Sequence, residues 1–346
     1  MANNTERKWY KMIDVLQHLP NCKVFSTVKQ SEDEQEWVKA RTRGIGGSDV
    51  GAICSVNQYA TARTIYFKKT GQYTEPEGGE FSPAAIERMS FGHILEPIVC
   101  DEYCKRSGKK VATSPATLVH KDYSWAIANV DRFILNEEGE PIGILEAKTA
   151  SELMAKDWES GDLPLSYLYQ LNWYLWVCDL KYGALACLVG GNKYYYYEIT
   201  RNDELLENEI LPKVLKFWHH NVANLIEPEL DGSLAATDLV NELGKDCKRN
   251  SEIMIEQPEV NELVETFVEC KAKIKELEKI MDEASNRIKD HMREHEIGYT
   301  ADYTIRWTPQ TQNRIDSEYL KINYPEIAEK CMKQITFRKF LVKGTK

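Results

Sequence analysis

The sequence lacks the features of a membrane-spanning or secreted protein. No run of about eighteen apolar residues occurs, which is the length that a helix needs to cross a bilayer. The opening stretch MANNTERKWYKMIDVLQ has no apolar core of a secretory signal. The 9 cysteines are scattered, odd in number and without a paired spacing, which is typical of reduced thiols. We therefore expect a cytoplasmic protein with no membrane partner.

The chain also lacks an excess of basic residues. Its 44 Lys and Arg are outnumbered by 54 Asp and Glu, which gives a net charge of −10. Repulsion by this charge disfavours a polyanionic partner, although a bound metal or a local basic cluster can reverse the field where it matters. There are two candidate basic clusters. One is formed by Lys68 and Lys69, and the other by Lys105, Arg106, Lys109 and Lys110. Clusters of this kind are also typical of ordinary solvated surface. The composition therefore leaves a nucleic-acid partner open.

What the sequence does have is enough material for two soluble domains. It contains 346 residues, of which 42% are hydrophobic and 28% charged, as in soluble globular proteins. Shifts in composition predict a first domain over residues 1–227, a linker over 228–256 and a C-terminal arm over 257–346.

A heptad pattern predicts that the arm is one long helix. Apolar residues recur every seventh position, at Val260, Phe267, Ile274, Met281 and Ile288, with a second apolar set three positions later. The pattern predicts a helix of about 33 residues, or ~50 Å at ~1.5 Å per residue. After this helix we expect two strands, in TADYTIRWT and ITFRKFLVK, on either side of DSEYLKINYPEIAEK.

Residues 127–150 predict two short apolar strands joined by an acidic turn that contains Gly and Pro. Asp131 falls on the first strand. Glu146 and Lys148 share one face of the second strand while Ala147 points away, because successive strand residues alternate between faces. Asp131 would lie across from them, and such a trio can hold a divalent cation on oxygen beside a charged amine. A solvated hairpin edge would show the same residue types.

A second candidate site lies in EWVKARTRGIGGSDVGAICSV. Trp37 and Arg41 are one helical turn apart, a glycine-rich turn follows, and Ser48 with Asp49 opens an apolar helical run that either residue would cap. Exposed amides at a helix start, with a hydroxyl and an Arg nearby, favour phosphate binding. An ordinary capped helix after a glycine turn explains the same pattern.

Two further polar residues lie within apolar helical segments. Glu96 falls on a helix expected from about Ala84 to Arg106, where it is either a surface residue or a buried member of a site. Gln170 falls on the aromatic helix SYLYQLNWYLWVCDL, either as an incidental polar residue or as part of a site. Residues 184–189 and 193–200 predict a second hairpin.

Taken together and in order, these residues resemble the YqaJ-type viral recombinase family, the lambda-exonuclease-like branch of the PD-(D/E)XK nucleases. The four landmarks are W-x3-R-x6-S at Trp37, Arg41 and Ser48, G-x3-E-P at Gly92, Glu96 and Pro97, Asp131 followed by E-x-K at Glu146 and Lys148, and the helical Gln170. The resemblance implies an α/β (α+β) fold with a restriction-endonuclease-like core. This core is a mixed central sheet flanked by helices, and a long C-terminal helix extends it.

The resemblance also implies a metal-dependent deoxyribonuclease, a 5′-to-3′ exonuclease that acts on linear duplex DNA in a phage-type recombination system. Asp131, Glu146 and the backbone carbonyl of Ala147 would bind one Mg²⁺, and Asp131 with Glu96 through water would support a second; Mn²⁺ is the alternative ion. Lys148 would orient or deprotonate the attacking water, its pKa lowered by the cations.

In this interpretation Gln170 would position Lys148 or the attacking water. Arg41 and Ser48 would hold a phosphate, such as the 5′-terminal one. Family resemblance further implies a homo-oligomer that encircles DNA as a ring of three, a single-strand annealing protein as partner of the arm, and the cytoplasm of a bacterial host. An endonuclease of the same superfamily and a non-catalytic recombination scaffold remain as alternatives.

The sequence departs from the family pattern at two points. The usual S-P-D-G around the catalytic Asp is Asn129, Val130, Asp131 and Arg132 here, so an amide replaces the hydroxyl and an Arg replaces the Gly. The spacing from Asp131 to Glu146 is also long, and the acidic turn absorbs it. These changes affect the contacts with the DNA strand that the resemblance implies.

Overall fold

The computed structural model describes residues 17–27, 34–72, 82–114, 117–248, 250–333 and 337–344. The chain forms two compact units, Met1–Asp246 and Cys247–Lys346.

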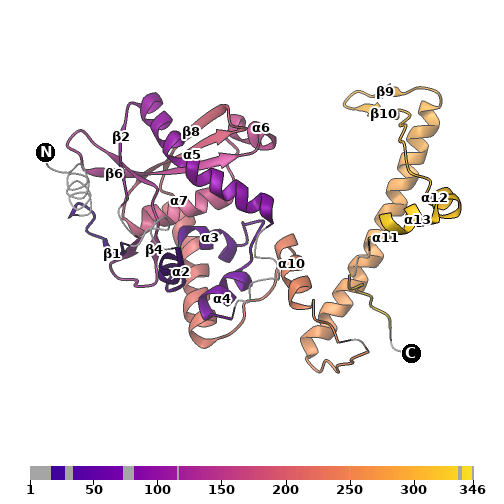
Figure 1. The fold of residues 1–346 in the computed structure, drawn as a ribbon, viewed down its shortest axis with the longest axis horizontal. Helices are drawn as coiled ribbons and strands as arrows, with labels where there is room; N and C mark the ends of the chain where they lie inside the picture. Colours follow the sequence, from indigo (N-terminus) through magenta and orange to yellow (C-terminus); the bar gives the residue numbers. More distant parts are fainter. Residues whose placement is uncertain are drawn as a thin grey trace. The chain divides into compact units, whose positions relative to one another are not determined.

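A mixed five-stranded sheet forms the centre of the first unit (Figure 1). Its strands, in spatial order, are β2 (Lys110–Thr113), β5 (Arg132–Leu135), β6 (Pro141–Ala150), β7 (Tyr182–Val189) and β8 (Lys193–Thr200). β6 and β7 are parallel, whereas every other neighbouring pair in this sheet is antiparallel. The mixed central sheet expected for the fold class is therefore present, with β6 in its middle. The hairpin of β7 and β8 is also where the sequence predicts it.

Two helices cover opposite faces of this sheet (Figure 1). Helix α5 (Pro83–Ser107) buries Val99 and Tyr103 in a cluster that includes Leu145 of β6. Helix α7 (Leu165–Val177) belongs to the larger cluster on the other face, which includes Ile144 of β6. Adjacent residues of β6 thus point to different helices, because side chains alternate along a strand.

A second, three-stranded sheet pairs β1 (Cys22–Ser26), β3 (Thr117–His120) and β4 (Ile127–Ala128). The first strand of the hairpin predicted over residues 127–150 is therefore split, which corrects the expectation of one continuous strand. β4 pairs with β3, whereas β5 pairs with β6. The indole Nε1 of Trp173 donates to the carbonyl of Ile127 at 3.0 Å and holds β4 against α7. The chain consequently changes sheets just before β5 begins.

Shorter helices complete the first unit. They are α2 (Glu34–Thr42), α3 (Gly47–Ile53), α4 (Ala62–Thr70), η1 (Glu152–Met154), α6 (Ala155–Ser160), α8 (Asp203–Leu205), η2 (Leu206–Ile210), α9 (Leu211–Lys216), η3 (Phe217–Val222) and α10 (Leu234–Leu243). Helix α10 lies within the predicted linker over residues 228–256. It belongs to the first unit because Ala235 and Ala236 are buried and Leu239 packs against the main core.

The second unit contains the predicted long helix, α11 (Pro258–Met292), which has 35 residues. β9 (Ile297–Tyr299) and β10 (Thr304–Arg306) form a two-stranded sheet, and α12 (Ser317–Asn323) and α13 (Pro325–Cys331) follow. β10 lies in the predicted strand TADYTIRWT, but its partner is β9. The other predicted strand, residues 335–343, is wrong over residues 337–343, which form no strand, and residues 335–336 lie outside the described part of the chain.

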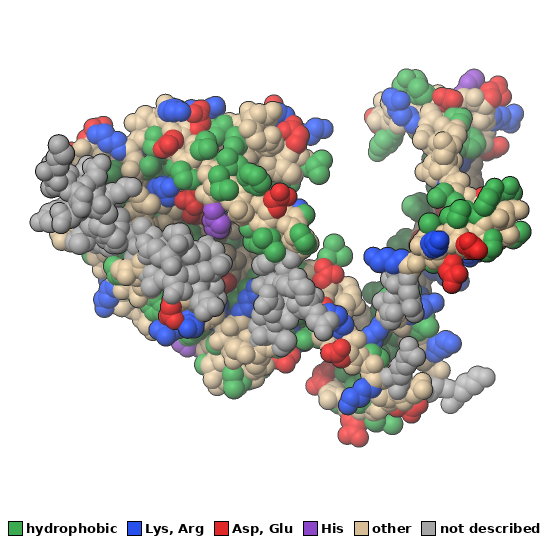
Figure 2. Space-filling model, viewed as in Figure 1, with side chains coloured by type: hydrophobic (Ala, Val, Ile, Leu, Met, Phe, Trp, Pro, Cys, Tyr) green, Lys and Arg blue, Asp and Glu red, His purple; other side chains and the backbone are tan. Residues whose placement is uncertain are grey.

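The surface carries no broad region of one charge on the face that Figure 2 shows. Lys and Arg side chains are intermixed there with Asp and Glu among the residues drawn in colour. Across the described ranges, none of the helices combines the length and the apolar composition that crossing a membrane requires.

Candidate active site

Asp131 lies at the point where the chain passes from β4 to β5. The pairing of Arg132 with Leu145 sets the register that places Asp131 opposite Glu146. Its Oδ2 accepts a hydrogen bond from the backbone N–H of Ala147 at 2.9 Å. Asp131 is therefore fixed against the middle strand of the sheet, as the sequence predicts, although it precedes β5 instead of lying within a longer strand.

Glu146, Lys148 and Gln170 form one hydrogen-bonded network between β6 and α7. Lys148 Nζ donates to Glu146 Oε1 at 2.7 Å and to Gln170 Oε1 at 3.1 Å. Gln170 Nε2 donates to the same Glu146 oxygen at 2.6 Å. Each of the three side chains contacts the other two, so the position of the amine depends on both partners. Three residues singled out from the sequence are thus brought together.

Burial and mutual repulsion dominate the electrostatics of the carboxylates. Burial raises the pKa of Asp131 well above its ordinary value, and the nearby charge of Glu146 raises it further. Burial likewise raises the pKa of Glu146, against the opposing effect of Lys148. For Lys148 burial disfavours the ammonium, but Glu146 and Asp131 outweigh it, so its pKa is raised. Without a bound cation the amine is held protonated, which is the opposite of the lowering expected when metal ions lie beside it.

Two tyrosines of α7, which sequence reasoning missed as members of the site, complete this network. The Lys148 ammonium lies 4.9 Å from the ring centroid of Tyr167, within the range of a cation–π contact. Gln170 Nε2 also lies 3.2 Å from the hydroxyl of Tyr174. Tyr167, Gln170 and Tyr174 are spaced at i, i+3 and i+7, which places them on one helical face. That spacing was the signal available in the sequence.

Glu96 lies in the same cleft but is engaged by Arg132. Glu96 Oε1 accepts from a guanidinium nitrogen of Arg132 at 2.7 Å, and the same nitrogen donates to the carbonyl of Asp131 at 2.6 Å. Arg132 lies on the face of the sheet that packs against α5. Its cross-strand neighbour, Leu145, belongs to the hydrophobic cluster that this helix forms with the sheet. The structure therefore places Glu96 beside Asp131 and gives it a cationic partner that the sequence did not reveal.

Arg41 and Ser48 are in direct contact. A guanidinium nitrogen of Arg41 donates to Ser48 Oγ at 2.7 Å. Helix α3 begins at Gly47 with Gly46 as its N-cap, so neither Ser48 nor Asp49 is the cap, contrary to expectation. Asp49 lies in the first turn of α3, where its carboxylate accepts a hydrogen bond from the backbone N–H of Gly46 at 2.9 Å.

A buried ion pair supports this corner of the site. Lys69 Nζ lies 2.8 Å from Asp49 Oδ2 and donates to the backbone carbonyl of Arg41 at 2.9 Å. Burial opposes ionisation of Asp49, but Lys69 and then Arg41 outweigh it and lower the pKa of the carboxyl. Lys69 had been noted in the sequence only as part of a basic cluster, because a contact between α3 and α4 leaves no local pattern.

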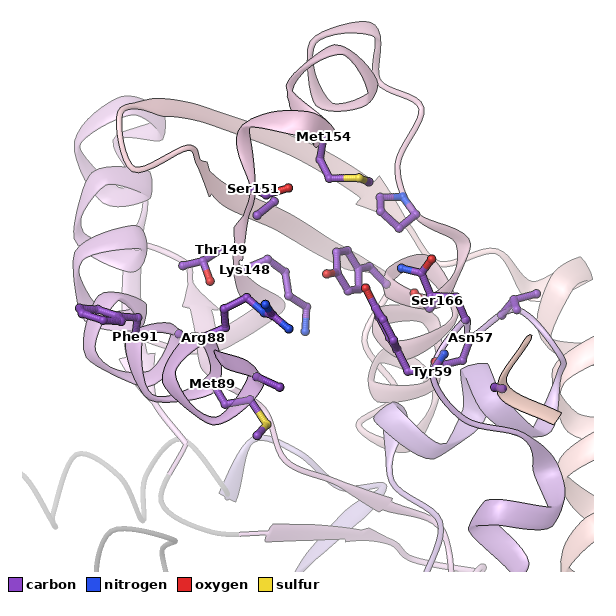
Figure 3. Close-up of a pocket in the computed structure, with 18 of the residues that line it drawn as sticks. Asn57, Tyr59, Arg88, Met89, Phe91, Lys148, Thr149, Ser151, Met154 and Ser166 are labelled. Carbon is purple, nitrogen blue, oxygen red and sulfur yellow. The ribbon is translucent and has the colours of Figure 1, made fainter. Parts of the chain in front are cut away.

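Five of the candidate residues line a cleft of about 2440 Å³ in the first unit, namely Glu96, Asp131, Glu146, Ala147 and Lys148, whereas Arg41, Ser48 and Gln170 are not part of its lining. This volume is larger than that of a small-molecule pocket, about 300–1,000 Å³. Its lining includes the acidic and basic residues Glu96, Asp131, Glu146, Lys148 and Arg88. Figure 3 shows Arg88 and Lys148 pointing into the cleft from α5 and β6. Arg88 was missed from the sequence, although it precedes Glu96 by eight residues and so lies near the same helical face.

The carboxylate pair of Asp131 and Glu146 fits a hard divalent cation. Glu146 Oε2 is buried and has no hydrogen-bond partner, which is costly unless another group satisfies it. Among the described residues no three Asp, Glu, His or Cys side chains are grouped to hold a metal ion. Mg²⁺ does not need three, because it is commonly bound by one or two carboxylates and completed by water and substrate phosphate. The donor set therefore suits Mg²⁺ better than a metal that requires an all-protein cage.

The fold and the site define the class of the protein. A mixed sheet covered by helices, with Asp131 before β5 and Glu146, Ala147 and Lys148 on β6, is the core of the PD-(D/E)XK class. The YqaJ-like viral recombinase domain matches residues 36–181. The YqaJ protein of Bacillus subtilis (strain 168) is 36% identical over 318 residues, which cover 91% of this chain and 96% of that protein. The chain belongs to the YqaJ-like viral recombinase family.

Solved structures of exonucleases are also similar to the chain. The alkaline exonuclease LHK-Exo of Laribacter hongkongensis is 17% identical, with a TM-score of 0.43, over 56% of this chain and 94% of that one. A phage-related exonuclease from Haemophilus somnus 129PT is 10% identical, with a TM-score of 0.39, over 53% of this chain and 96% of that one.

Proposed function

We propose that the protein is a metal-dependent deoxyribonuclease that digests linear duplex DNA from its 5′ ends in a phage-type recombination system. The observation that carries the proposal is the network of Glu146, Lys148 and Gln170 opposite Asp131, with Asp131, Glu146 and Lys148 in the lining of a large cleft. A buried carboxylate pair with one fixed amine suits phosphodiester hydrolysis, because that reaction requires charge stabilisation and a positioned water.

The side chains have distinct tasks in this proposal. Asp131, Glu146 and the backbone carbonyl of Ala147 would hold Mg²⁺, or Mn²⁺ in its place. The bound ion would stabilise negative charge on the attacking and leaving oxygens. Lys148 would orient the attacking water or, with the pKa of its ammonium lowered by a bound cation, deprotonate it. Gln170 would keep Lys148 in place.

Two groups would hold the DNA. Arg41 with Ser48 presents a guanidinium and a hydroxyl that suit the 5′-terminal phosphate. Arg88 and Lys148 place positive charge inside the cleft, where a strand would pass. A local cluster of this kind allows an acidic chain to bind a polyanion, because charges beyond the screening length of about 8–10 Å contribute little.

Assembly and partners form a further part of the proposal. A homotrimeric ring around DNA would retain the substrate topologically. The apolar seam of α11 is exposed, with Leu263 at 67%, Ile274 at 56% and Leu277 at 64%, and suits a single-strand annealing protein. Light scattering of the full chain would test the ring, and loss of annealing-protein binding in Leu277→Asp would test the seam.

The experiment that tests the activity uses end-labelled linear duplex with increasing Mg²⁺. Replacing Lys148 with Ala should leave the protein folded and slow nucleotide release by about 100-fold or more, the usual scale for a group that positions or transfers a proton. Lys193→Ala, on the surface, is the matched control. Cleavage by the Lys148→Ala protein at the normal rate would remove Lys148 from the mechanism. Cleavage of closed circular duplex would favour an endonuclease instead.

A further inference from the structure

Arg132 is the residue of the active site that the proposed chemistry leaves without a task. It occupies the position of the usual Gly after the catalytic Asp. One of its guanidinium nitrogens contacts both Glu96 Oε1 at 2.7 Å and the backbone carbonyl of Asp131 at 2.6 Å. Only 15% of the Arg132 side chain and 28% of the Glu96 side chain are exposed. The guanidinium is thus a fixed part of the site and not a mobile surface group.

We propose that Arg132 replaces a second metal ion, so that this active site works with a single divalent cation held by Asp131 and Glu146. The inference rests on the proposed metal-dependent nuclease and revises the two ions implied by family resemblance. Arg132 neutralises Glu96, the carboxylate that would otherwise support the second ion. Arginine suits this task because its charge is permanent and its planar fork matches a carboxylate.

The charges of the site agree with one ion. Glu96 is paired with Arg132 and Glu146 with Lys148, and Asp131 is a third carboxylate nearby, so these five groups carry one net negative charge when all are ionised, with Arg88 of the cleft lining not counted. One Mg²⁺ would make the site positive by one unit, which a single phosphodiester charge balances. Two ions would leave an excess of three positive charges in a cleft whose carboxylates are buried, and uncompensated charge is costly there.

The geometry points the same way. The only unpartnered buried carboxylate oxygen among the described residues is Oε2 of Glu146. Glu96 already has a hydrogen-bonded cation, and no group of three acidic side chains converges in the described part of the chain. An ion beside Glu96 would have to displace Arg132 or lie against its guanidinium.

The test counts Mn²⁺ ions bound to the full chain, by calorimetry and by electron paramagnetic resonance, without DNA. The unaltered protein should bind one Mn²⁺. Arg132→Ala should bind a second, because removing the fixed cation frees Glu96, whereas Arg132→Lys keeps the charge and should still bind one. Two ions of similar affinity in the unaltered protein would overturn the inference. So would a single ion in an Arg132→Ala protein whose circular dichroism shows it to be folded.

A second variant tests the inference independently if Arg132→Ala does not fold. Glu96→Gln should leave the affinity for the single Mn²⁺ unchanged, since Glu96 is not committed to that ion. If Glu96 were a ligand or its hydrogen-bonded support, affinity should fall by about 10–100-fold, which would overturn the inference. Failure of the proposed function would give a different result from failure of this inference. An unaltered protein that binds no Mn²⁺ and cleaves no DNA would contradict the proposed nuclease activity itself.

Discussion

Gln170 on α7 and Glu146 on β6 are joined by a hydrogen bond of 2.6 Å, and this bond connects the helix to the middle strand of the central sheet. Replacing Gln170 with Ala removes a partner of both Glu146 and Lys148 while leaving both in the site. We expect a fall in kcat of about 10–100-fold, as for other groups that orient a reacting residue, with little change in KM for DNA. Ser166→Ala, on the same helix and also in the cleft lining, is the control. An unchanged kcat would show that Lys148 is positioned without Gln170.

Gly47 makes this network possible by leaving room for it. A Cβ at Gly47 would lie 2.5 Å from a ring carbon of Tyr174 and 2.9 Å from Cγ of Gln170. Gly47→Ala should therefore displace Gln170, lower the activity and destabilise the fold by about 1–3 kcal/mol, the usual cost of overpacking. Gly92 on α5 is the matched control, since a Cβ there meets nothing closer than 3.8 Å. The free energy of unfolding of both variants, measured in urea, tests this expectation. Equal stability of the two variants would contradict the packing argument.

Local patterns predicted that Glu146 and Lys148 lie together with Asp131 across from them, whereas their interpretation as a site and the inclusion of Gln170 came from the resemblance to the family. Strand alternation places Glu146 and Lys148 on one face, and the antiparallel hairpin places Asp131 across from them. The heptad pattern predicts the long helix in the same way, whereas the mixed central sheet was expected from the resemblance to the family. Their roles in binding metal and DNA stay predictions, since geometry brings side chains together without showing what they bind.

The remaining features depend on contacts between distant segments, for which a single sequence carries no local signal. The pairing of Arg132 with Glu96 joins residues 36 positions apart. The split of the predicted first strand arises because β3 competes for residues 127–128. The residues of α10 were assigned to a linker in the prediction because their stretch of sequence is mostly polar. The helix packs against the first unit through only a few apolar residues, such as Leu239.

Arg41 should determine the preference for phosphorylated 5′ ends. Its guanidinium contacts Ser48 Oγ at 2.7 Å, so the two polar groups converge on one point. Arg41→Ala should slow digestion of 5′-phosphorylated duplex by about 10-fold or more, since a charge-assisted hydrogen bond contributes roughly 1.5–3 kcal/mol, while digestion of 5′-hydroxyl duplex changes little. Arg43→Ala, two residues away and exposed, is the control. Equal slowing on both kinds of end would show that Arg41 does not read the terminal phosphate.

Asp49 should make the stability of the first unit depend on acid pH. Its pKa is lowered in the fold from the ordinary 3.8, because Lys69 and Arg41 outweigh the effect of burial. A carboxyl with a lowered pKa stabilises the fold fully above its ordinary value, and this contribution is lost as the pH falls through the folded value. Asp49→Asn removes the carboxylate partner of Lys69, of whose side chain only 6% is exposed, so we expect a loss of about 3–5 kcal/mol at neutral pH. Measured by urea unfolding, the difference from the unaltered protein should shrink as the pH falls below about 4. A difference that stayed constant with pH would mean that the Asp49 side chain acts through packing and not through its charge.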